Sequence, residues 1–185
     1  MIEQHFMFTV PLYKISINDW DVKKSVVLDI IGDSNYYEDE LSGNQLTDFN
    51  YSRHGLGKEY NDYSKPIWDF LFPYMETIIH HLGIELESNF VPSMWSQKYY
   101  KFSRHDIHHH GQKGYSCILY IKYNVDVHKS TRFLSPFNNF LTGSTTWFSP
   151  DVREGDLIVF PSTILHESPT QTSDEERMIL SFNLH

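Results

Sequence analysis

Four of the 11 histidines in this chain lie close together in the stretch RHDIHHHGQKGYSCILYIKY, residues 104–123. The cluster comes directly before an apolar run that is rich in β-forming residues. Side chains alternate between faces in an extended chain, so His108 and His110 point the same way and His109 points away. His105 has the opposite parity unless the chain bends. Imidazole is a common transition-metal ligand, so His108 and His110 together offer two adjacent metal positions.

Two adjacent histidines cannot complete a metal site, so a third ligand has to come from elsewhere in the chain. His166 is the candidate, because it follows the β-rich run LIVF and a turn at Pro161. Three nitrogen ligands on one side of an ion leave positions open on the other side, as a catalytic site requires. The competing interpretation is a solvated histidine-rich turn, because a short motif alone is weak support for a site.

Arg177 is the second residue with chemical potential, because it opens the β-rich segment RMILSFNL. A guanidinium at the start of a core strand is costly to leave unpaired, and its planar fork matches a carboxylate. We therefore consider Arg177 a carboxylate anchor. The competing interpretation is an exposed arginine that pairs with Glu175 or Glu176.

The pattern of the chain changes near residue 89, and we predict one domain over residues 1–185 with two parts. The second part, 89–185, consists of short β runs separated by turn residues. The first part, 1–88, reads as a β segment interrupted by a proline, two helical patterns and a long polar loop. The β segment lies at 5–17, the helical patterns lie at 18–31 and 65–83, and the polar loop lies at 35–65. The fold class that this order favours is mainly β with helices (α+β), a jelly roll buttressed by N-terminal helices.

The composition of the chain limits the classes of partner that we expect. The formal net charge is −9 and no basic block is present, which argues against nucleic acid. No stretch reaches the roughly 20 apolar residues that span a bilayer, so we expect no membrane association. The single cysteine, Cys117, allows no internal disulfide and fits a reducing compartment. We expect a cytoplasmic protein, or one in the host cytoplasm if its source is a virus.

From its cluster of histidines onward, the chain resembles the 2-oxoglutarate- and Fe(II)-dependent oxygenases. The similarity is greatest to small prolyl-4-hydroxylase-like members of that superfamily from bacteria and phages. The matching stretches are HHH, then SCILYI and STRF, then GDLIVFPSTILH ending at His166, and finally RMILSFNL from Arg177. The resemblance covers about half of the chain, 105–184, and implies a double-stranded β-helix core.

One position departs from the family pattern. Where the family has the carboxylate of a His-x-Asp pair, this chain has His110. Two interpretations remain open: iron held by His108, His110 and His166, or a carboxylate supplied from elsewhere, with Asp106 as the candidate. We favour three histidines, because the spacing from His110 to the following β run matches the family. A neutral third ligand leaves the site one charge more positive and could weaken iron binding or alter reactivity.

The resemblance also implies cofactors and roles. Fe(II) and 2-oxoglutarate would be bound together, with O₂ as the co-substrate. The far carboxylate of 2-oxoglutarate would pair with Arg177, assisted by Tyr120. Ser181 shares the parity of Arg177 and could reach the same pocket. The implied activity is hydroxylation of a small-molecule or peptide substrate, for example a peptidyl proline.

Two alternative functions remain at this point. A zinc-dependent hydrolase or hydratase could use the same three histidines, although it gives Arg177 no role. A non-catalytic jelly-roll module for binding or assembly would need neither the histidines nor the arginine. The oligomeric state is open.

Overall fold

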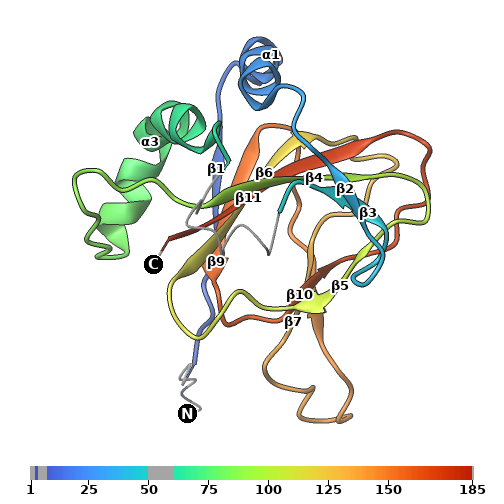
Figure 1. The fold of residues 1–185 in the computed structure, drawn as a ribbon. Helices are drawn as coiled ribbons and strands as arrows, with labels where there is room; N and C mark the ends of the chain where they lie inside the picture. The colour runs from blue at the N-terminus through green and yellow to red at the C-terminus, as the bar shows by residue number, and fades with distance from the viewer. Residues whose placement is uncertain (1–2, 4–7, 50–60, 185) are drawn as a thin grey trace.

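The computed structural model describes residue 3 and residues 8–49 and 61–184. Within those residues the chain forms two β-sheets with helices on one side (Figure 1). The larger sheet has the strand order β1-β9-β6-β11-β4-β3-β2, and the smaller has the order β5-β10-β7-β8. All of the strand pairings are antiparallel, and neighbours in the sheets are often far apart in sequence. This is the double-stranded β-helix that the sequence predicted.

The larger sheet draws on the whole chain. Its strands are β1 (Tyr13–Ser16), β2 (Tyr37–Asp39), β3 (Gln45–Thr47), β4 (Met94–Tyr99), β6 (Tyr115–Lys122), β9 (Asp156–Pro161) and β11 (Arg177–Leu184). The smaller sheet consists of β5 (His105–His108), β7 (Arg132–Leu134), β8 (Trp147–Phe148) and β10 (His166–Ser168). The short β runs predicted over 89–185 contain β4, β6, β7, β8, β9 and β11.

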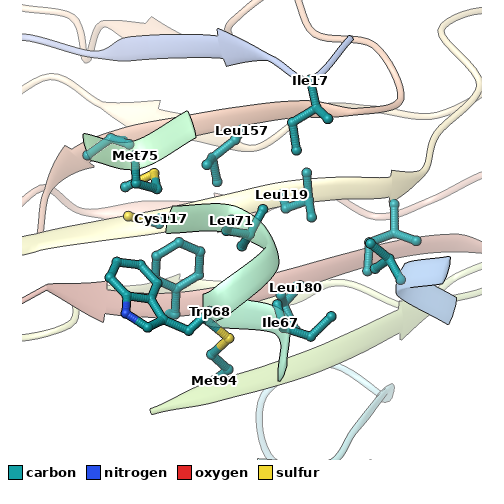
Figure 2. Close-up of a cluster of buried hydrophobic side chains, with 14 of the residues drawn as sticks. Ile17, Ile67, Trp68, Leu71, Met75, Met94, Cys117, Leu119, Leu157 and Leu180 are labelled. Carbon is teal, nitrogen blue, oxygen red and sulfur yellow. The ribbon is translucent and has the colours of Figure 1, made fainter. Parts of the chain in front are cut away.

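The two faces of the larger sheet have different partners. On β11, Met178, Leu180 and Phe182 point to the outer face and join the main hydrophobic cluster with residues of the two helices, part of which Figure 2 shows. Residues of the opposite parity, such as Arg177 and Ile179, point inward, toward the smaller sheet. Alternation along one strand therefore gives an apolar support on one side and a partly polar interior on the other.

The helices are α1 (Trp20–Ile31) and α3 (Ser64–His81). Gly32 ends α1 with φ 57°, and Gly83 follows α3 with φ 65°, as expected of glycine after a helix. Pro73 lies inside α3 and does not divide it into two helices. Neither described helix combines the length and the apolarity that a bilayer span requires.

The polar segment 35–65, predicted as a loop, is partly structured. It contains β2 and β3, which extend the larger sheet because Thr47 pairs with Gln97 and Leu46 with Lys98. Residues 50–60 lie outside the described part of the chain. The segment has low β propensity, so the pairing with β4 decides its structure and local pattern does not.

Candidate metal centre

His108, His110 and His166 converge in the structure. One ring nitrogen from each lies within 4.8 Å of the other two. His166 starts β10 and is the register partner of His108, which ends β5. The backbone N–H of His110 donates to the Ser162 carbonyl at 2.9 Å, which fixes the chain just beyond β5. The third histidine is therefore brought in by strand pairing across the smaller sheet.

Hydrogen bonds set the orientation of each of these three rings. Nδ1 of His108 lies 2.7 Å from its acceptor, the Asp106 carbonyl, and Nδ1 of His166 lies 2.9 Å from the Ile164 carbonyl. Nδ1 of His110 lies 2.8 Å from Oδ1 of Asn183. A proton on each Nδ1 places the lone pair on Nε2, which is the arrangement that metal-binding histidines adopt. The three rings thus share the tautomer that a metal ion needs.

His105 also lies beside this group, contrary to its predicted parity. Its ring is stacked on His108, with centroids 3.9 Å apart and planes 24° apart. The register of β5 against β10 shifts between the His166–His108 and Ser168–His105 pairs, so β5 has one extra residue there. This bulge turns His105 onto the ligand face. Gln97 contacts its Nδ1 through Nε2 at 3.1 Å.

Asp106, the alternative carboxylate ligand, is not brought into the group. Its carboxylate accepts a hydrogen bond from Nε of Arg104 at 2.6 Å, and about half of each of these two side chains is exposed. The metal-ligand group found among the described residues contains no carboxylate.

Burial favours the neutral form of His105, His108 and His166. Desolvation, together with the nearby His108 and His110, lowers the pKa of His105 to about 3. Desolvation lowers the pKa of His166 well below its ordinary value, and that of His108 is lowered too despite its bond to the Asp106 carbonyl. Neutral imidazole is the form that binds a metal.

Arg177 is fully buried on the inner face of β11. Its Nη1 donates to the Ser168 hydroxyl at 2.9 Å, whereas Nε and Nη2 have no hydrogen-bond partner in the described part of the chain. The guanidinium carbon lies 4.6 Å from the centre of the Tyr99 ring and 5.6 Å from that of Tyr120. A buried guanidinium with two orphaned donors is suited to receive a carboxylate.

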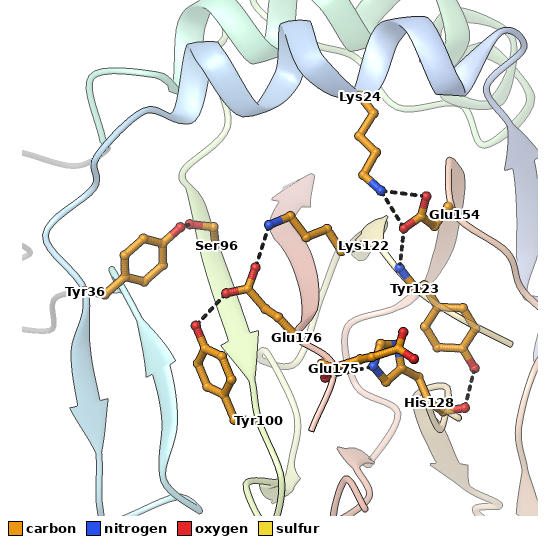
Figure 3. Close-up of polar contacts among 10 residues, drawn as sticks. All are labelled: Lys24, Tyr36, Ser96, Tyr100, Lys122, Tyr123, His128, Glu154, Glu175 and Glu176. Carbon is orange, nitrogen blue, oxygen red and sulfur yellow. Dashed lines mark hydrogen bonds and ion pairs between the residues drawn. The ribbon is translucent and has the colours of Figure 1, made fainter. Parts of the chain in front are cut away.

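The two glutamates before Arg177 have other partners, so the competing interpretation, an exposed arginine paired with one of them, is wrong. Glu176 accepts from Lys122 at 2.7 Å and from the Tyr100 hydroxyl at 2.5 Å (Figure 3). Glu175 accepts from Nδ2 of Asn124 at 3.1 Å. These contacts keep both acidic groups away from the buried guanidinium.

Tyr120 and Ser181, the other predicted anchors, are both buried on this inner face. The Tyr120 hydroxyl donates to Oγ1 of Thr131 at 3.0 Å and accepts from the Thr131 N–H at 3.2 Å. The Ser181 hydroxyl lies 3.5 Å from Oε1 of Gln97. The Tyr120 ring therefore lies near the guanidinium, but its hydroxyl is hydrogen-bonded to Thr131.

Two cavities meet at the histidines. An open groove of about 710 Å³ is lined by the β2–β3 region, residues 90–95 and 105–111. A small inner pocket of about 10 Å³ is lined by groups from β4, β5, β6, β10 and β11. Four side chains line both cavities, namely Gln97, His105, His108 and His110.

Several residues at this site were missed from the sequence. Tyr99 lies against Arg177 because the two are register partners in β4 and β11, and Ser168 reaches the guanidinium from the smaller sheet. Gln97 lies two residues before Tyr99 on β4, so the alternation of side chains would have placed both on one face. No local signal indicates that this face meets β11 at Arg177.

Residues 93–183 match a family model described as "Putative 2OG-Fe(II) oxygenase". This match spans the strands that carry the three histidines and Arg177. Over these residues, about half of its length, the chain matches the 2-oxoglutarate- and Fe(II)-dependent oxygenase superfamily. It is thus an oxygenase whose cofactors are Fe(II) and 2-oxoglutarate, with O₂ as co-substrate.

Solved structures share the fold of this oxygenase. A Pseudomonas putida prolyl-4-hydroxylase is similar with a TM-score of 0.62 and 13% identity, over 96% of this chain and 94% of that one. HygX from Streptomyces hygroscopicus, solved with nickel, 2-oxoglutarate and hygromycin B, gives a TM-score of 0.63 and 10% identity, over 95% and 82% of the two chains. No curated protein sequence matches the oxygenase significantly.

A third similar structure contains a peptide. It is a prolyl hydroxylase from Trichoplax adhaerens in complex with a peptide fragment of the hypoxia inducible factor oxygen degradation domain. Its TM-score is 0.58 at 12% identity, and the alignment covers 94% of the oxygenase and 83% of that chain. Identities this low establish the fold that the proteins share, and they leave the substrate to be argued from the site.

Proposed function

We propose that this oxygenase holds iron through His108, His110 and His166 and binds the far carboxylate of 2-oxoglutarate at Arg177. We further propose that it hydroxylates a peptidyl side chain, such as that of proline. The observation that carries the proposal is Arg177, which is fully buried and has two guanidinium nitrogens without a partner among the described residues. A buried cation without a partner is unfavourable, so we expect an anion to bind beside it.

The donor set fits the metal. Three neutral imidazoles, each with Nδ1 bonded to an acceptor, can present Nε2 to one ion and leave its other positions open. Bound iron and 2-oxoglutarate supply the oxidative chemistry, in which one C–H bond and O₂ give C–OH while 2-oxoglutarate becomes succinate and CO₂. The site differs from a His-x-Asp site by one charge, because His110 is neutral where a carboxylate would be negative.

The protein contributes binding and exclusion of water. Arg177 and Ser168 offer donors to the far carboxylate, and the Tyr99 ring covers the guanidinium. The interior around them is apolar as well as buried, since Tyr99, Ile118 and Ile179 belong to the second hydrophobic cluster. Charge-assisted hydrogen bonds are stronger in such a dry environment. A zinc hydrolase would leave this anion site without a role.

The groove supports a peptide substrate. It opens next to His108 and His110, and its volume of about 710 Å³ has room for a short stretch of peptide as well as for a small molecule. Trp95 lines the groove, with Phe49 at 5.0 Å and His110 at 5.4 Å between ring centroids. An aromatic wall beside a metal ligand suits the apolar ring of proline. The similar structures of a prolyl-4-hydroxylase and of a prolyl hydroxylase with a peptide point in the same direction.

Two measurements test the proposal. Anaerobic addition of Fe(II) and 2-oxoglutarate should give a visible charge-transfer band, which the His166→Ala variant should lose and the His109→Ala variant should keep. In air, a capped proline-containing peptide should stimulate succinate formation and gain one oxygen atom. A wild-type protein that shows no band, with no 2-oxoglutarate-induced rise in melting temperature, would contradict the cofactor assignment. A band without peptide oxidation would contradict only the substrate.

A further inference from the structure

The inner pocket is too small for the co-substrate as it stands. Its volume of about 10 Å³ is close to the minimum that holds a single water molecule. A five-carbon dicarboxylate that reaches from the histidines to Arg177 needs much more room. Some part of the wall must therefore move before 2-oxoglutarate can bind.

Most of the wall is fixed by sheet pairing. Tyr99, Ile118 and Ile179 lie in the paired strands β4, β6 and β11, and each is at most 3% exposed. His166, another wall residue, is 2% exposed. Arg177 lies behind the wall as the register partner of Tyr99 and is 0% exposed. Moving any of these side chains would disrupt a packed core.

His105 faces both cavities from the edge strand β5. His108 does so too, but it is one of the three proposed metal ligands, so bound iron would hold it in place. His105 lines the open groove as well as the inner pocket, and it is only partly buried. β5 lies at the end of the smaller sheet, so no strand of that sheet covers its outer edge. The His105 side chain thus lies between the open groove and the inner pocket.

Backbone contacts hold the strand while leaving this side chain able to rotate. The N–H groups of Arg104 and Asp106 donate to the carbonyls of Gly43 and Ser42, both at 2.8 Å. The backbone is therefore fixed on either side of His105. Opening the pocket then requires rotation of one imidazole and leaves β5 in place.

Two contacts keep the imidazole in the closed position. Gln97 meets Nδ1 at 3.1 Å, and the ring is stacked on His108 at 3.9 Å. Gln97 is 4% exposed and is itself placed by the Ser181 hydroxyl, 3.5 Å from Oε1. Breaking the bond to Gln97 should lower the barrier to rotation while leaving the His108 ligand in place.

We propose that His105, held by Gln97, is the gate through which 2-oxoglutarate passes from the groove to Arg177. This inference rests on the proposed function, because it assumes that 2-oxoglutarate binds between the histidines and Arg177. It assigns His105 a role in admitting the co-substrate, distinct from the metal-binding role of the other three histidines.

Stopped-flow mixing of the anaerobic Fe(II) protein with 2-oxoglutarate tests the gate through the rate at which the visible band forms. In the wild type that rate should level off at high 2-oxoglutarate, where opening limits it. Gln97→Leu should raise the limiting rate about tenfold, the effect of losing one hydrogen bond. His105→Phe, which keeps a stacked ring but cannot bond Gln97, should do the same. Ile107→Ala is the matched control, because Ile107 lines only the groove and should leave the rate unchanged.

The outcomes separate the two proposals. A wild type that forms no band refutes the proposed function, and the gate with it. A wild type that forms the band at a rate unaffected by both Gln97→Leu and His105→Phe refutes the gate alone. Iron content of each variant, measured by metal analysis after desalting, should equal that of the wild type if the substitutions act on the gate. Loss of iron from both variants would show instead that Gln97 and His105 hold the proposed ligand His108 in position, and would overturn the gate.

Discussion

The guanidinium carbon of Arg177 lies 4.6 Å from the centre of the ring of Tyr99, a residue that lines the inner pocket. Nη1 of Arg177 donates to the Ser168 hydroxyl, and its Nε and Nη2 have no hydrogen-bond partner in the described part of the chain. A charge buried with so few partners lowers stability until an anion joins it. Stability and co-substrate binding should therefore be coupled through this side chain.

Replacing the buried charge tests that coupling. Without ligand, Arg177→Met should increase the free energy of unfolding by about 1–4 kcal/mol, since a well-packed apolar residue replaces an unpaired ion. It should also abolish the stabilisation of the wild type by 2-oxoglutarate. Urea unfolding with and without 2-oxoglutarate measures both effects. Arg153→Met, at an exposed position, is the control and should retain the response. A destabilised Arg177→Met variant that still responds to 2-oxoglutarate would count against the assignment.

Neighbouring histidines should differ sharply in metal binding. His110→Ala removes one of three proposed ligands and should weaken Fe(II) or Co(II) binding at least about 100-fold, beyond the 10-fold to 100-fold typical of losing an outer partner. His109→Ala removes an exposed ring outside the group and should leave the affinity unchanged. Titration with Co(II), followed by absorbance, compares the two directly. Equal losses in both variants would argue for a loosely organised histidine-rich turn.

The buried histidines predict a pH-dependent stability in the presence of EDTA. The native pKa of His105 is about 3 and that of His166 is well below its ordinary value. As the pH falls below about 6.5, the unfolded chain takes up protons that the native protein does not bind. The free energy of unfolding should be level above pH 7 and fall by about 1.4 kcal/mol per pH unit for each such histidine.

Urea unfolding between pH 7.5 and pH 5.5 measures this dependence. The His105→Phe variant should show a smaller slope, because it removes one of the depressed groups. A free energy that does not change over this interval would show that the histidines take up protons equally in both states, and would contradict their burial.

Gly43 allows the β2–β3 turn to pack closely against β5, the strand that carries His108, and we expect this packing to support metal binding. It has φ 127°, and a Cβ there would lie 2.5 Å from Cγ and 2.6 Å from O of Arg104. Gly43→Ala should therefore displace the turn from β5 and reduce metal affinity. Gly143→Ala, also at positive φ but with nothing within 4 Å, isolates the backbone strain of about 1–2 kcal/mol. Unchanged metal affinity in Gly43→Ala would show that the turn does not support the site.

Much of the fold could be predicted from local pattern. The β runs of the second half are rich in β-forming residues and are separated by turn residues, so their strands were identified. The order of the motifs indicated the double-stranded β-helix. The strands β2 and β3 could not be predicted, because their residues are polar and adopt extended structure through pairing with Lys98 and Gln97 of β4. Pairing partners far apart in sequence leave no local pattern.

The candidate site, like the fold, could be predicted only in part. Parity correctly grouped His108 with His110, and the family order suggested His166. Parity failed at His105, because a bulge in β5 adds one residue and reverses its face. Alternation along β4 could have placed Tyr99 and Gln97 on one face, but their positions next to Arg177 and His105 depend on sheet register, which no single strand determines.

A crystal structure grown anaerobically with Fe(II) and 2-oxoglutarate would test the central claim most directly. We expect one ion bonded to Nε2 of His108, His110 and His166 at about 2.0–2.2 Å, within the range of metal–imidazole bonds. The far carboxylate should accept hydrogen bonds from Nε or Nη2 of Arg177. An ion bound by the Asp106 carboxylate, or a 2-oxoglutarate molecule that makes no contact with Arg177, would contradict the account.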